Sequence, residues 1–171
     1  MIDFETKKVL FIDLDGTLIK TISGKTFPED VSDFRIQLPV LDKIVEKLPN
    51  LKRFLIVTNQ GGLKSTTAEW DFKAKLHSIE DICYMYLDNR LSDFGCTDSM
   101  YCSSMDKTNP YRKPNTAMLE SLSGQWEIES KEECIMIGDA SGKPGDFSDS
   151  DKKCAENFGI DYIDVRDFLE L

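Results

Sequence analysis

The sequence of 171 residues contains little of what zinc and redox sites are made from. It has one histidine, His77, and five cysteines, none of which stands in a Cys-x-x-Cys pair. A structural zinc site needs about four closely grouped Cys or His ligands, so we expect none in this chain. The odd number and wide spacing of the cysteines indicate free thiols in a reducing compartment.

Long apolar runs and targeting signals are missing as well. No apolar run is long enough to cross a bilayer, and residues 1–5 lack the basic and apolar regions of a signal peptide. We therefore expect an intracellular protein, in the cytoplasm or the nucleus, that does not enter a membrane.

Basic residues are in deficit, because 21 Lys and Arg stand against 31 Asp and Glu and give a formal net charge of −10. Extended electrostatic contact with nucleic acid requires clustered Lys and Arg, so this balance argues against it. A small site that grips one terminal phosphate is still compatible with the charge.

Two nucleotide-binding signatures are absent. The sequence has no G-x-x-x-x-G-K-[S/T] motif, and no G-x-G-x-x-G motif follows a predicted strand. We therefore expect neither ATP nor a dinucleotide as a ligand.

Apolar runs and helical patterns alternate along the chain. With 40% hydrophobic and 30% charged residues the composition is that of a folded protein, and the length favours a single domain over residues 1–171. The alternation predicts an α/β fold, with a Rossmann-like three-layer α/β/α arrangement around a central, mostly parallel sheet. The expected strands are residues 9–12, 54–57, 100–102, 134–137 and 161–164, and the expected helices are 38–48, 67–91, 115–122 and 152–157.

Several local features accompany these elements. The apolar stripe of helix 67–91 is expected to include Trp70 and Ile82. Asn115 is expected to cap the helix that it begins, and Gly159 to stop the last helix.

Residues 20–33, with Ser23-Gly24-Lys25 near their middle, predict a hairpin or flap directly after the first strand, where it could cover a site. The acidic residues of segment 161–171 are expected to form a solvated face.

The first predicted strand ends in two carboxylates, Asp13 and Asp15. Side chains alternate along a strand, so both should lie on one side at its carboxyl end, where open α/β sheets bind ligands. Adjacent carboxylates repel each other unless a cation neutralises them, and Mg²⁺ suits one or two carboxylates together with phosphate oxygens. This pattern indicates metal-assisted phosphate chemistry.

Polar residues also follow the other predicted strands. A phosphoryl-transfer site needs a nucleophile, a metal, donors for the phosphate oxygens and a general acid or base, and all of these types are present. Each of these residues or pairs, taken alone, is common in turns or on surfaces. Their joint occurrence at one edge of the sheet is much less common. The residues are Thr58-Asn59, Arg112-Lys113, Asp139 and, soon after it, Asp146, Asp149 and Asp151.

In this order the motifs resemble the haloacid dehalogenase-like (HAD) phosphatase superfamily. The matching pieces are Asp13-Leu14-Asp15-Gly16-Thr17, Thr58-Asn59, Lys113 and Gly138-Asp139. Further pieces are similar to the phosphatase domain of the polynucleotide kinase 3′-phosphatase family, from about residue 8 to 168. These are Ser23-Gly-Lys-Thr-Phe-Pro, Thr58-Asn-Gln, Asp71-Phe-Lys-Ala-Lys, Tyr111-Arg-Lys-Pro, Gly138-Asp-Ala-Ser-Gly-Lys-Pro, Asp146-Phe-Ser-Asp-Ser-Asp and Asn157-Phe-Gly-Ile.

The resemblance implies a role for each matching residue. Asp13 would be a nucleophile that forms an aspartyl-phosphate, with its second oxygen on Mg²⁺. Asp15 would protonate the leaving hydroxyl and then activate water, with its backbone carbonyl on the metal. Thr58 and Lys113 would hold the transferring phosphoryl group.

The resemblance also implies the remaining ligands. Asp139 and Asp151 would complete the metal site, and Asp151 could position a metal-bound water or Lys113. Lys25, Asn59, Arg112 and Lys143 would bind substrate.

The implied function is a stand-alone, monomeric phosphatase that removes 3′-phosphate from nucleic-acid ends during repair. The alternative is a small-molecule phosphatase of the same superfamily, acting on histidinol phosphate or a heptose bisphosphate. Many of those enzymes carry a Cys/His zinc loop before the Arg-Lys-Pro, whereas Cys102 stands alone here. A phosphate-binding module without activity is the hypothesis from another class, and Mg²⁺-dependent turnover would exclude it.

Overall fold

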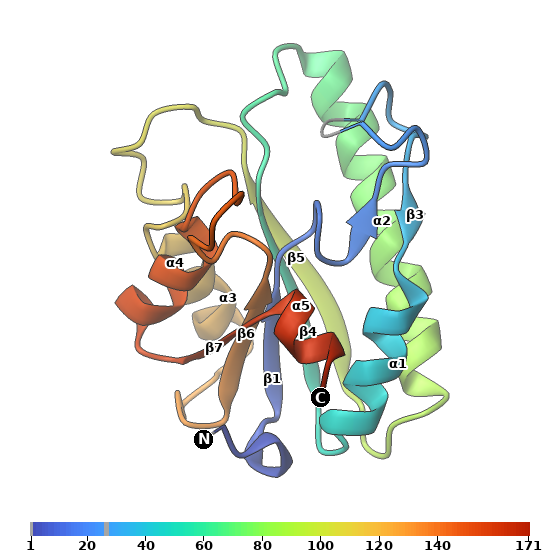
Figure 1. Ribbon diagram of the computed structural model, residues 1–171, viewed down its shortest axis with the longest axis vertical. Coiled ribbons are helices and arrows are strands. Elements are labelled where there is room, and N and C mark those ends of the chain that lie inside the picture. The colour runs from blue at the N-terminus through green and yellow to red at the C-terminus, as the bar shows by residue number, and fades with distance from the viewer. Residues whose placement is uncertain (1, 26–27) are drawn as a thin grey trace.

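The centre of the molecule is one five-stranded parallel sheet (Figure 1). The computed structural model describes residues 2–25 and 28–171. The strand order is β5-β4-β1-β6-β7, so the strand that ends in the two carboxylates lies in the middle. The strands are β1 (Val9–Ile12), β4 (Arg53–Asn59), β5 (Cys96–Cys102), β6 (Cys134–Gly138) and β7 (Asp161–Asp164).

Helices cover both faces of the sheet, which confirms the predicted three-layer α/β/α fold. Phe11 and Ile12 are both fully buried but point to opposite faces, so they belong to two different apolar clusters. Ile12 packs in the cluster of α1, α2 and α5, and Phe11 in that of α3 and α4. The helices are η1 (Phe4–Thr6), α1 (Leu38–Lys47), α2 (Thr66–Asp88), α3 (Ala117–Gln125), α4 (Ser150–Phe158) and α5 (Val165–Leu169).

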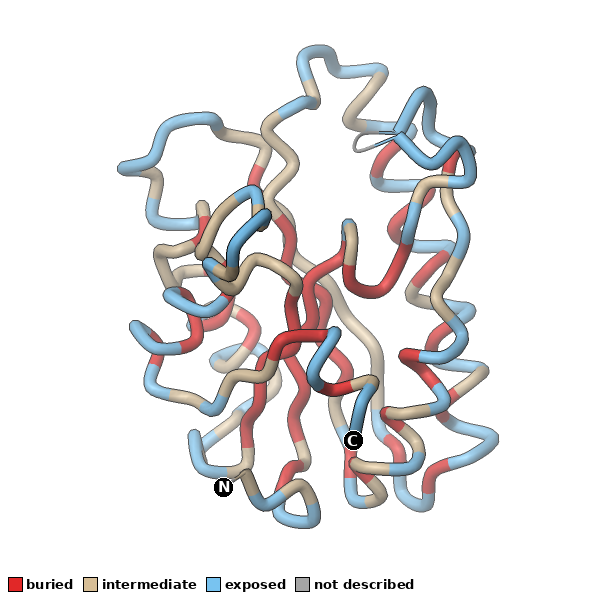
Figure 2. The backbone as a smooth tube through the Cα atoms, in the orientation of Figure 1, coloured by how far each residue is buried: buried red, intermediate tan, exposed pale blue. Residues whose placement is uncertain are grey.

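The central strands are apolar because they are covered on both sides. Every residue of β1 is buried, as Figure 2 shows for the middle of the sheet. Full burial of one such side chain contributes about 1.5–3 kcal/mol, so β1 is held firmly between its neighbours. The hydrogen bond from Asp13 N to Ile137 O (3.0 Å) extends the pairing with β6 by one residue beyond the strand.

The predicted flap is present between two short antiparallel strands, β2 (Ile19–Lys20) and β3 (Arg35–Ile36). Asp33 holds its base, because the carboxylate accepts hydrogen bonds from Ser23 N (2.8 Å), Ser23 Oγ (2.6 Å) and Glu29 N (2.9 Å). The hydrogen bond from the Ser23 side chain is the main reason why the pKa of Asp33 falls to about 2. The flap lies beside the first half of α2 (Figure 1). Residues 26 and 27 of the predicted flap lie outside the described residues.

Some local predictions were wrong. Trp70 is 69% exposed and Ile82 45% exposed, so neither belongs to the buried stripe of α2. Asn115 does not cap α3, which begins after Thr116, because its amide donates instead to Lys107 O (3.1 Å) and Asn109 O (2.8 Å).

The predicted end of the last long helix is confirmed, whereas the third predicted strand is longer than expected. Gly159 ends α4 in the left-handed conformation (φ 84°), as predicted. Strand β5 starts four residues before the predicted Met100, at Cys96, because its whole length pairs with β4. Among the described residues, every helix is too short or too polar to cross a lipid bilayer.

Candidate active site

Four loops or strand ends bring polar side chains to the carboxyl edge of the sheet. Asp13 follows β1, Thr58 lies near the end of β4, Lys113 lies in the loop after β5, and Asp139 follows β6. Asp151 joins them from the first turn of α4. These positions agree with the edge at which ligands bind in open α/β sheets.

Lys113 is the centre of this group. It is 3% exposed, and its ammonium lies 2.6 Å from Asp13 Oδ1 and 2.7 Å from Asp151 Oδ1. The third partner of the ammonium is Val57 O, at 2.8 Å. Burial lowers the pKa of Lys113, but the charges of Asp13 and Asp151 outweigh burial and leave that pKa above its ordinary value. Lys113 is therefore a permanently charged cation with a fixed position.

Asn59 fixes the backbone that carries this lysine. Its amide donates to Lys113 O (3.0 Å), and its carbonyl accepts from Lys113 N (2.9 Å). Two hydrogen bonds between the same pair of residues join the end of β4 to the loop after β5. The structure thus gives the Asn59 side chain a partner inside the protein.

Asp15 faces solvent and is held by Gln60. The Gln60 amide donates to Asp15 Oδ2 (2.6 Å) and to Thr58 Oγ1 (2.9 Å). Gln60 was not among the predicted site residues, although it lies two residues after Thr58, the spacing of side chains on the same face of a strand. Gln60 sets the distance between an exposed carboxylate and a buried hydroxyl.

Two glycines allow the carboxylates to approach the backbone closely. A Cβ atom on Gly16 would lie 2.1 Å from Asp139 Oδ2, and Gly16 also has a positive φ of 84°. A Cβ atom on Gly138 would lie 2.4 Å from Asp151 Oδ2. Any larger residue at either position would displace an acid of the site.

The acids of the site repel one another. Burial raises the pKa of Asp13 well above its ordinary value, the nearby Asp151 raises it further, and Lys113 offsets only part of this. Burial, followed by the charge of Asp151, raises the pKa of Asp139 to about 6. The single positive charge of Lys113 does not neutralise the three carboxylates of Asp13, Asp139 and Asp151.

A divalent cation fits this deficit of charge. Asp13, Asp139 and Asp151 each offer a carboxylate oxygen within 4.8 Å of the others. Hard carboxylate oxygens are the ligands that Mg²⁺ takes. The Asp15 carboxylate is not part of this group.

The loop that carries Asp139 is tied down by the C-terminal helix. Arg166 of α5 forms ion pairs with Asp146 Oδ1 (2.8 Å) and Asp164 Oδ2 (2.5 Å). Ser141 Oγ lies between the same two carboxylates, 2.9 Å from Asp146 Oδ2 and 2.6 Å from Asp164 Oδ2, and its one hydrogen can donate to either. We predicted a solvated acidic face for segment 161–171, but Asp164 is 3% exposed because it caps α5 and binds Arg166.

The remaining predicted substrate residues lie on loops and already have partners. Lys25 pairs with Glu29 in the flap. Arg112 donates to Ser104 O (2.8 Å), and Lys143 lies 2.6 Å from Asp167. Both lysine pairs are exposed, so their energies are small and a ligand can displace them.

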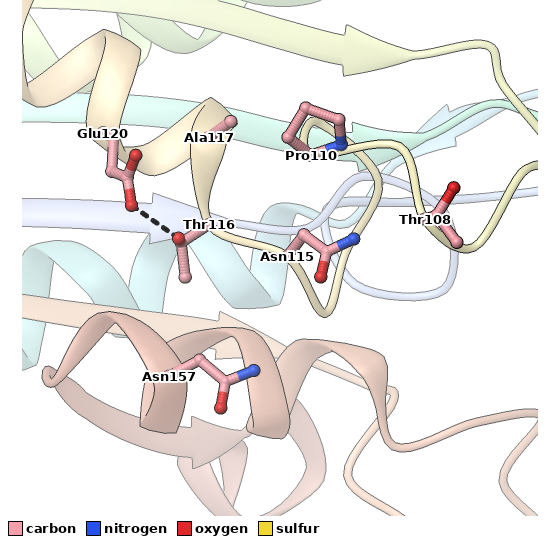
Figure 3. A pocket seen from close by; sticks show the side chains of 7 residues that line it. All are labelled: Thr108, Pro110, Asn115, Thr116, Ala117, Glu120 and Asn157. Carbon is pink, nitrogen blue, oxygen red and sulfur yellow. Dashed lines mark hydrogen bonds between the residues drawn. The ribbon is translucent and has the colours of Figure 1, made fainter.

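A hollow of about 310 Å³ lies beside the loop between β5 and α3, which also carries Lys113. Figure 3 shows that its walls come from the loop before α3, from α3 itself and from α4. Thr116 Oγ1 donates to Glu120 across its rim (2.6 Å). No carboxylate of the Asp13 group lines it, so the hollow does not mark the site of chemistry.

We expect Asp139→Asn to stabilise the metal-free protein. The folded-state pKa of about 6 lies above the ordinary value, so the stability that the protonated form contributes is lost as pH rises from about 4 through 6. In EDTA the wild type should lose roughly 1–2 kcal/mol of unfolding free energy between pH 5 and 7, and the variant less.

Thermal unfolding at pH 5, 6 and 7 measures this difference. Mg²⁺ should raise the midpoint of the wild type at pH 7 and have little effect on the variant. If the unfolding midpoints of both proteins depend on pH in the same way, the charge of Asp139 does not destabilise the metal-free protein.

Residues 8–168 match the family described as "Polynucleotide kinase 3 phosphatase". The chain is 32% identical, over 96% of its length, to a bifunctional polynucleotide phosphatase/kinase of Schizosaccharomyces pombe, of which it spans 38%. It is 30% identical, over 93% of its length, to the histidine biosynthesis bifunctional protein HisB of Legionella pneumophila, of which it spans 41%. The chain therefore spans less than half the length of these two relatives.

A solved structure has a similar fold. The D,D-heptose 1,7-bisphosphate phosphatase of B. bronchiseptica, complexed with magnesium and phosphate, has a TM-score of 0.55 to this chain. It is 16% identical, and the match covers 95% of this chain and 96% of that one.

Proposed function

The chain belongs to the polynucleotide kinase 3 phosphatase family, and on that premise we propose that it removes 3′-phosphate groups from nucleic-acid ends in a Mg²⁺-dependent reaction. The class of enzyme follows from the family: it is a HAD-type phosphatase that hydrolyses phosphoric monoesters. The observation that carries the proposal is the buried Asp13 carboxylate, 2.6 Å from the Lys113 ammonium, with Asp15 two residues further on. In this proposal residues 1–171 act as a single domain.

Asp13 is the proposed nucleophile. Its free oxygen forms a bond to phosphorus as the bond from phosphorus to the leaving oxygen breaks, which gives an aspartyl-phosphate and an alcohol. Asp15 gives its proton to that leaving oxygen. In the second half of the reaction Asp15 takes a proton from water, which attacks phosphorus and releases Asp13 and inorganic phosphate.

Lys113 and Thr58 hold the transferring group in this scheme. Lys113 offsets negative charge on phosphate oxygens that approach Asp13, and the Thr58 hydroxyl donates to one of them. Asp13, Asp139 and Asp151 would hold Mg²⁺, which supplies further positive charge for the phosphoryl group. Asn59 is a positioning residue, because its side chain binds the backbone of Lys113.

Gln60 sets the geometry of the acid. It anchors Asp15 at 2.6 Å while Asp15 remains exposed, so the carboxyl can reach both a leaving oxygen and water.

The substrate assignment depends on the family and on the charge. A net charge of −10 permits few phosphate contacts, and Lys25, Arg112 and Lys143 are the proposed ones. Binding of an oligonucleotide should therefore depend only weakly on salt, with two or three contacts. The relative in histidine biosynthesis supports a second candidate, a small-molecule phosphate monoester.

A substrate panel tests the proposal. It compares kcat/KM for a 3′-phosphorylated oligonucleotide, the same oligonucleotide with a 5′-phosphate, histidinol phosphate and a heptose bisphosphate. We expect the 3′-phosphorylated oligonucleotide to be hydrolysed fastest and the 5′-phosphate hardly at all. If a small molecule wins by about tenfold or more, the second candidate replaces the first.

Asp15→Asn should impair the enzyme in a way that depends on the leaving group. A sugar hydroxyl needs a proton as it leaves, whereas p-nitrophenolate needs little. The fold-loss in kcat should therefore be much larger for the oligonucleotide than for p-nitrophenyl phosphate, by about tenfold or more. An equal loss on both substrates would show that Asp15 acts on the structure of the site instead.

A further inference from the structure

Lys75 of α2 is a buried lysine that forms no ion pair. It exposes 8% of its surface, yet no carboxylate of a described residue lies within 4.0 Å of its ammonium. It is the last residue of the segment Asp71-Phe-Lys-Ala-Lys. The proposed chemistry gives this residue no role.

The other buried lysines show how unusual this is. Lys7 is 3% exposed, and its ammonium lies 2.5 Å from both Asp161 and Glu132 O. Lys113 has three partners between 2.6 and 2.8 Å. The described residues offer the Lys75 ammonium no such partner, and burial of most of the side chain reduces its contact with water, which disfavours the charged form.

Lys75 lies at the base of the flap and within electrostatic range of Asp15. Its ammonium lies 4.8 Å from the centre of the Phe34 ring, at the base of the flap. Asp15 and Asp33 are the carboxylates whose charge acts on it, and burial outweighs both and lowers the pKa of Lys75. Figure 1 shows the same arrangement at the level of the elements, with the flap beside the first half of α2.

This place corresponds to the leaving-group side of the proposed reaction. Asp15 is the proposed proton donor to the leaving oxygen, so the leaving alcohol must lie against it. Lys113, in contrast, contacts the nucleophile Asp13 on the phosphoryl side. The site thus has one fully paired cation for the phosphate that is transferred and one unpaired cation near the acid that faces the rest of the substrate.

We propose that Lys75 binds a second anionic group on the leaving alcohol and so selects substrates whose leaving group is itself charged. In the proposed function this anion is the phosphodiester that joins the last two nucleotides. The identification of the anion as a phosphodiester rests on the proposed function. The preference for a charged over a neutral leaving group depends only on Lys75. The Phe34 ring, 4.8 Å from the ammonium, covers one side of it and leaves less water to compete for the charge.

The test replaces Lys75 by Met, which keeps the length and removes the charge. It compares kcat/KM for a 3′-phosphorylated dinucleotide, which has the phosphodiester, with that for a nucleoside 3′-phosphate, which lacks it. We expect the ratio of the two values to fall about tenfold or more, as for loss of a charged hydrogen bond. The salt dependence for the dinucleotide should become shallower by about 0.7 in the slope of log kcat/KM against log salt, which corresponds to one contact.

Lys73→Met is the matched control. Lys73 lies on the same helix but is exposed, with only Glu69 at 4.0 Å and the Trp70 ring nearby. Its replacement should leave the ratio unchanged. The thermal unfolding midpoint of Lys75→Met should equal or exceed that of the wild type, because an unpaired buried charge is removed.

Two results would overturn the inference. One is an unchanged ratio in Lys75→Met, and the other is an equal fall of both kcat/KM values, which would show a general effect on the site. Failure of the proposed function is a separate result, seen when the wild type prefers a sugar phosphate. In that case kcat/KM of the wild type and of Lys75→Met is compared for a sugar bisphosphate and the matching monophosphate. An unchanged ratio of the two values, or an equal fall of both, would again overturn the inference.

Discussion

Asp13→Asn is expected to abolish turnover, with a loss in kcat of about a thousandfold or more, because an amide cannot attack phosphorus. The fold should remain intact. Asp13 is buried and its carboxyl is disfavoured in its charged form, so an uncharged amide of the same size should keep or raise the stability measured in EDTA. Steady-state kinetics with saturating Mg²⁺ and thermal unfolding in EDTA measure the two effects.

The control for this experiment is Asp13→Ala, which cannot return to Asp by deamidation. If the Asn variant turns over substrate and the Ala variant does not, the activity comes from Asn that has deamidated to Asp. Residual activity above about one percent of wild type in the Ala variant would remove Asp13 from the role of nucleophile.

Lys113→Met should have the largest effect on stability. The ammonium has three buried partners, and its loss leaves Asp13 and Asp151 together without a cation. Removing one member of a buried ion pair costs about 3–5 kcal/mol, so we expect a fall of this size in the free energy of unfolding in EDTA. Activity should fall with it, since the phosphoryl group loses its fixed cation.

A double variant separates charge from packing in that result. Lys113→Met with Asp151→Asn removes one of the stranded acids, so it should be more stable than Lys113→Met alone. Lys152→Met is the surface control, because Lys152 is half exposed and its nearest acid, Glu156, lies 4.0 Å away. Its effect should stay within about 0.5 kcal/mol. If Lys113→Met is as stable as the wild type, the contacts of Lys113 make no net contribution to the free energy of unfolding.

The sequence was most informative where a short apolar run meets polar residues. Strand β1 is such a run, and parallel topology then brings the residues after it and after β4 and β6 to one edge. This is why Asp13, Thr58 and Asp139 could be placed together without a structure. The fold class followed from the same alternation of strands and helices.

Contacts between distant side chains could not be predicted in this way. Asn59 stands where a ligand-binding residue was expected, but its amide faces the backbone of Lys113, 54 residues later. Trp70 was expected in the buried stripe of α2, but it lies nine residues before Ile79, which is about two and a half helical turns. It therefore lies on the opposite face of α2 and points to solvent. Lys75 shows the reverse case, since a lysine in a helix is ordinarily exposed, whereas Lys75 lies at helical spacing with the buried Phe72 and Ile79.

The ion pairs of Arg166 have a consequence for the order of events during synthesis. The central strands β1, β4 and β6 can pair as soon as Gly138 has emerged from the ribosome. The loop that carries Asp139 is fixed only when Arg166 arrives and binds Asp146 and Asp164. We therefore expect the three central strands to pair before the loop after β6 is ordered, and the loop to become ordered only when the last residues of the described chain are in place.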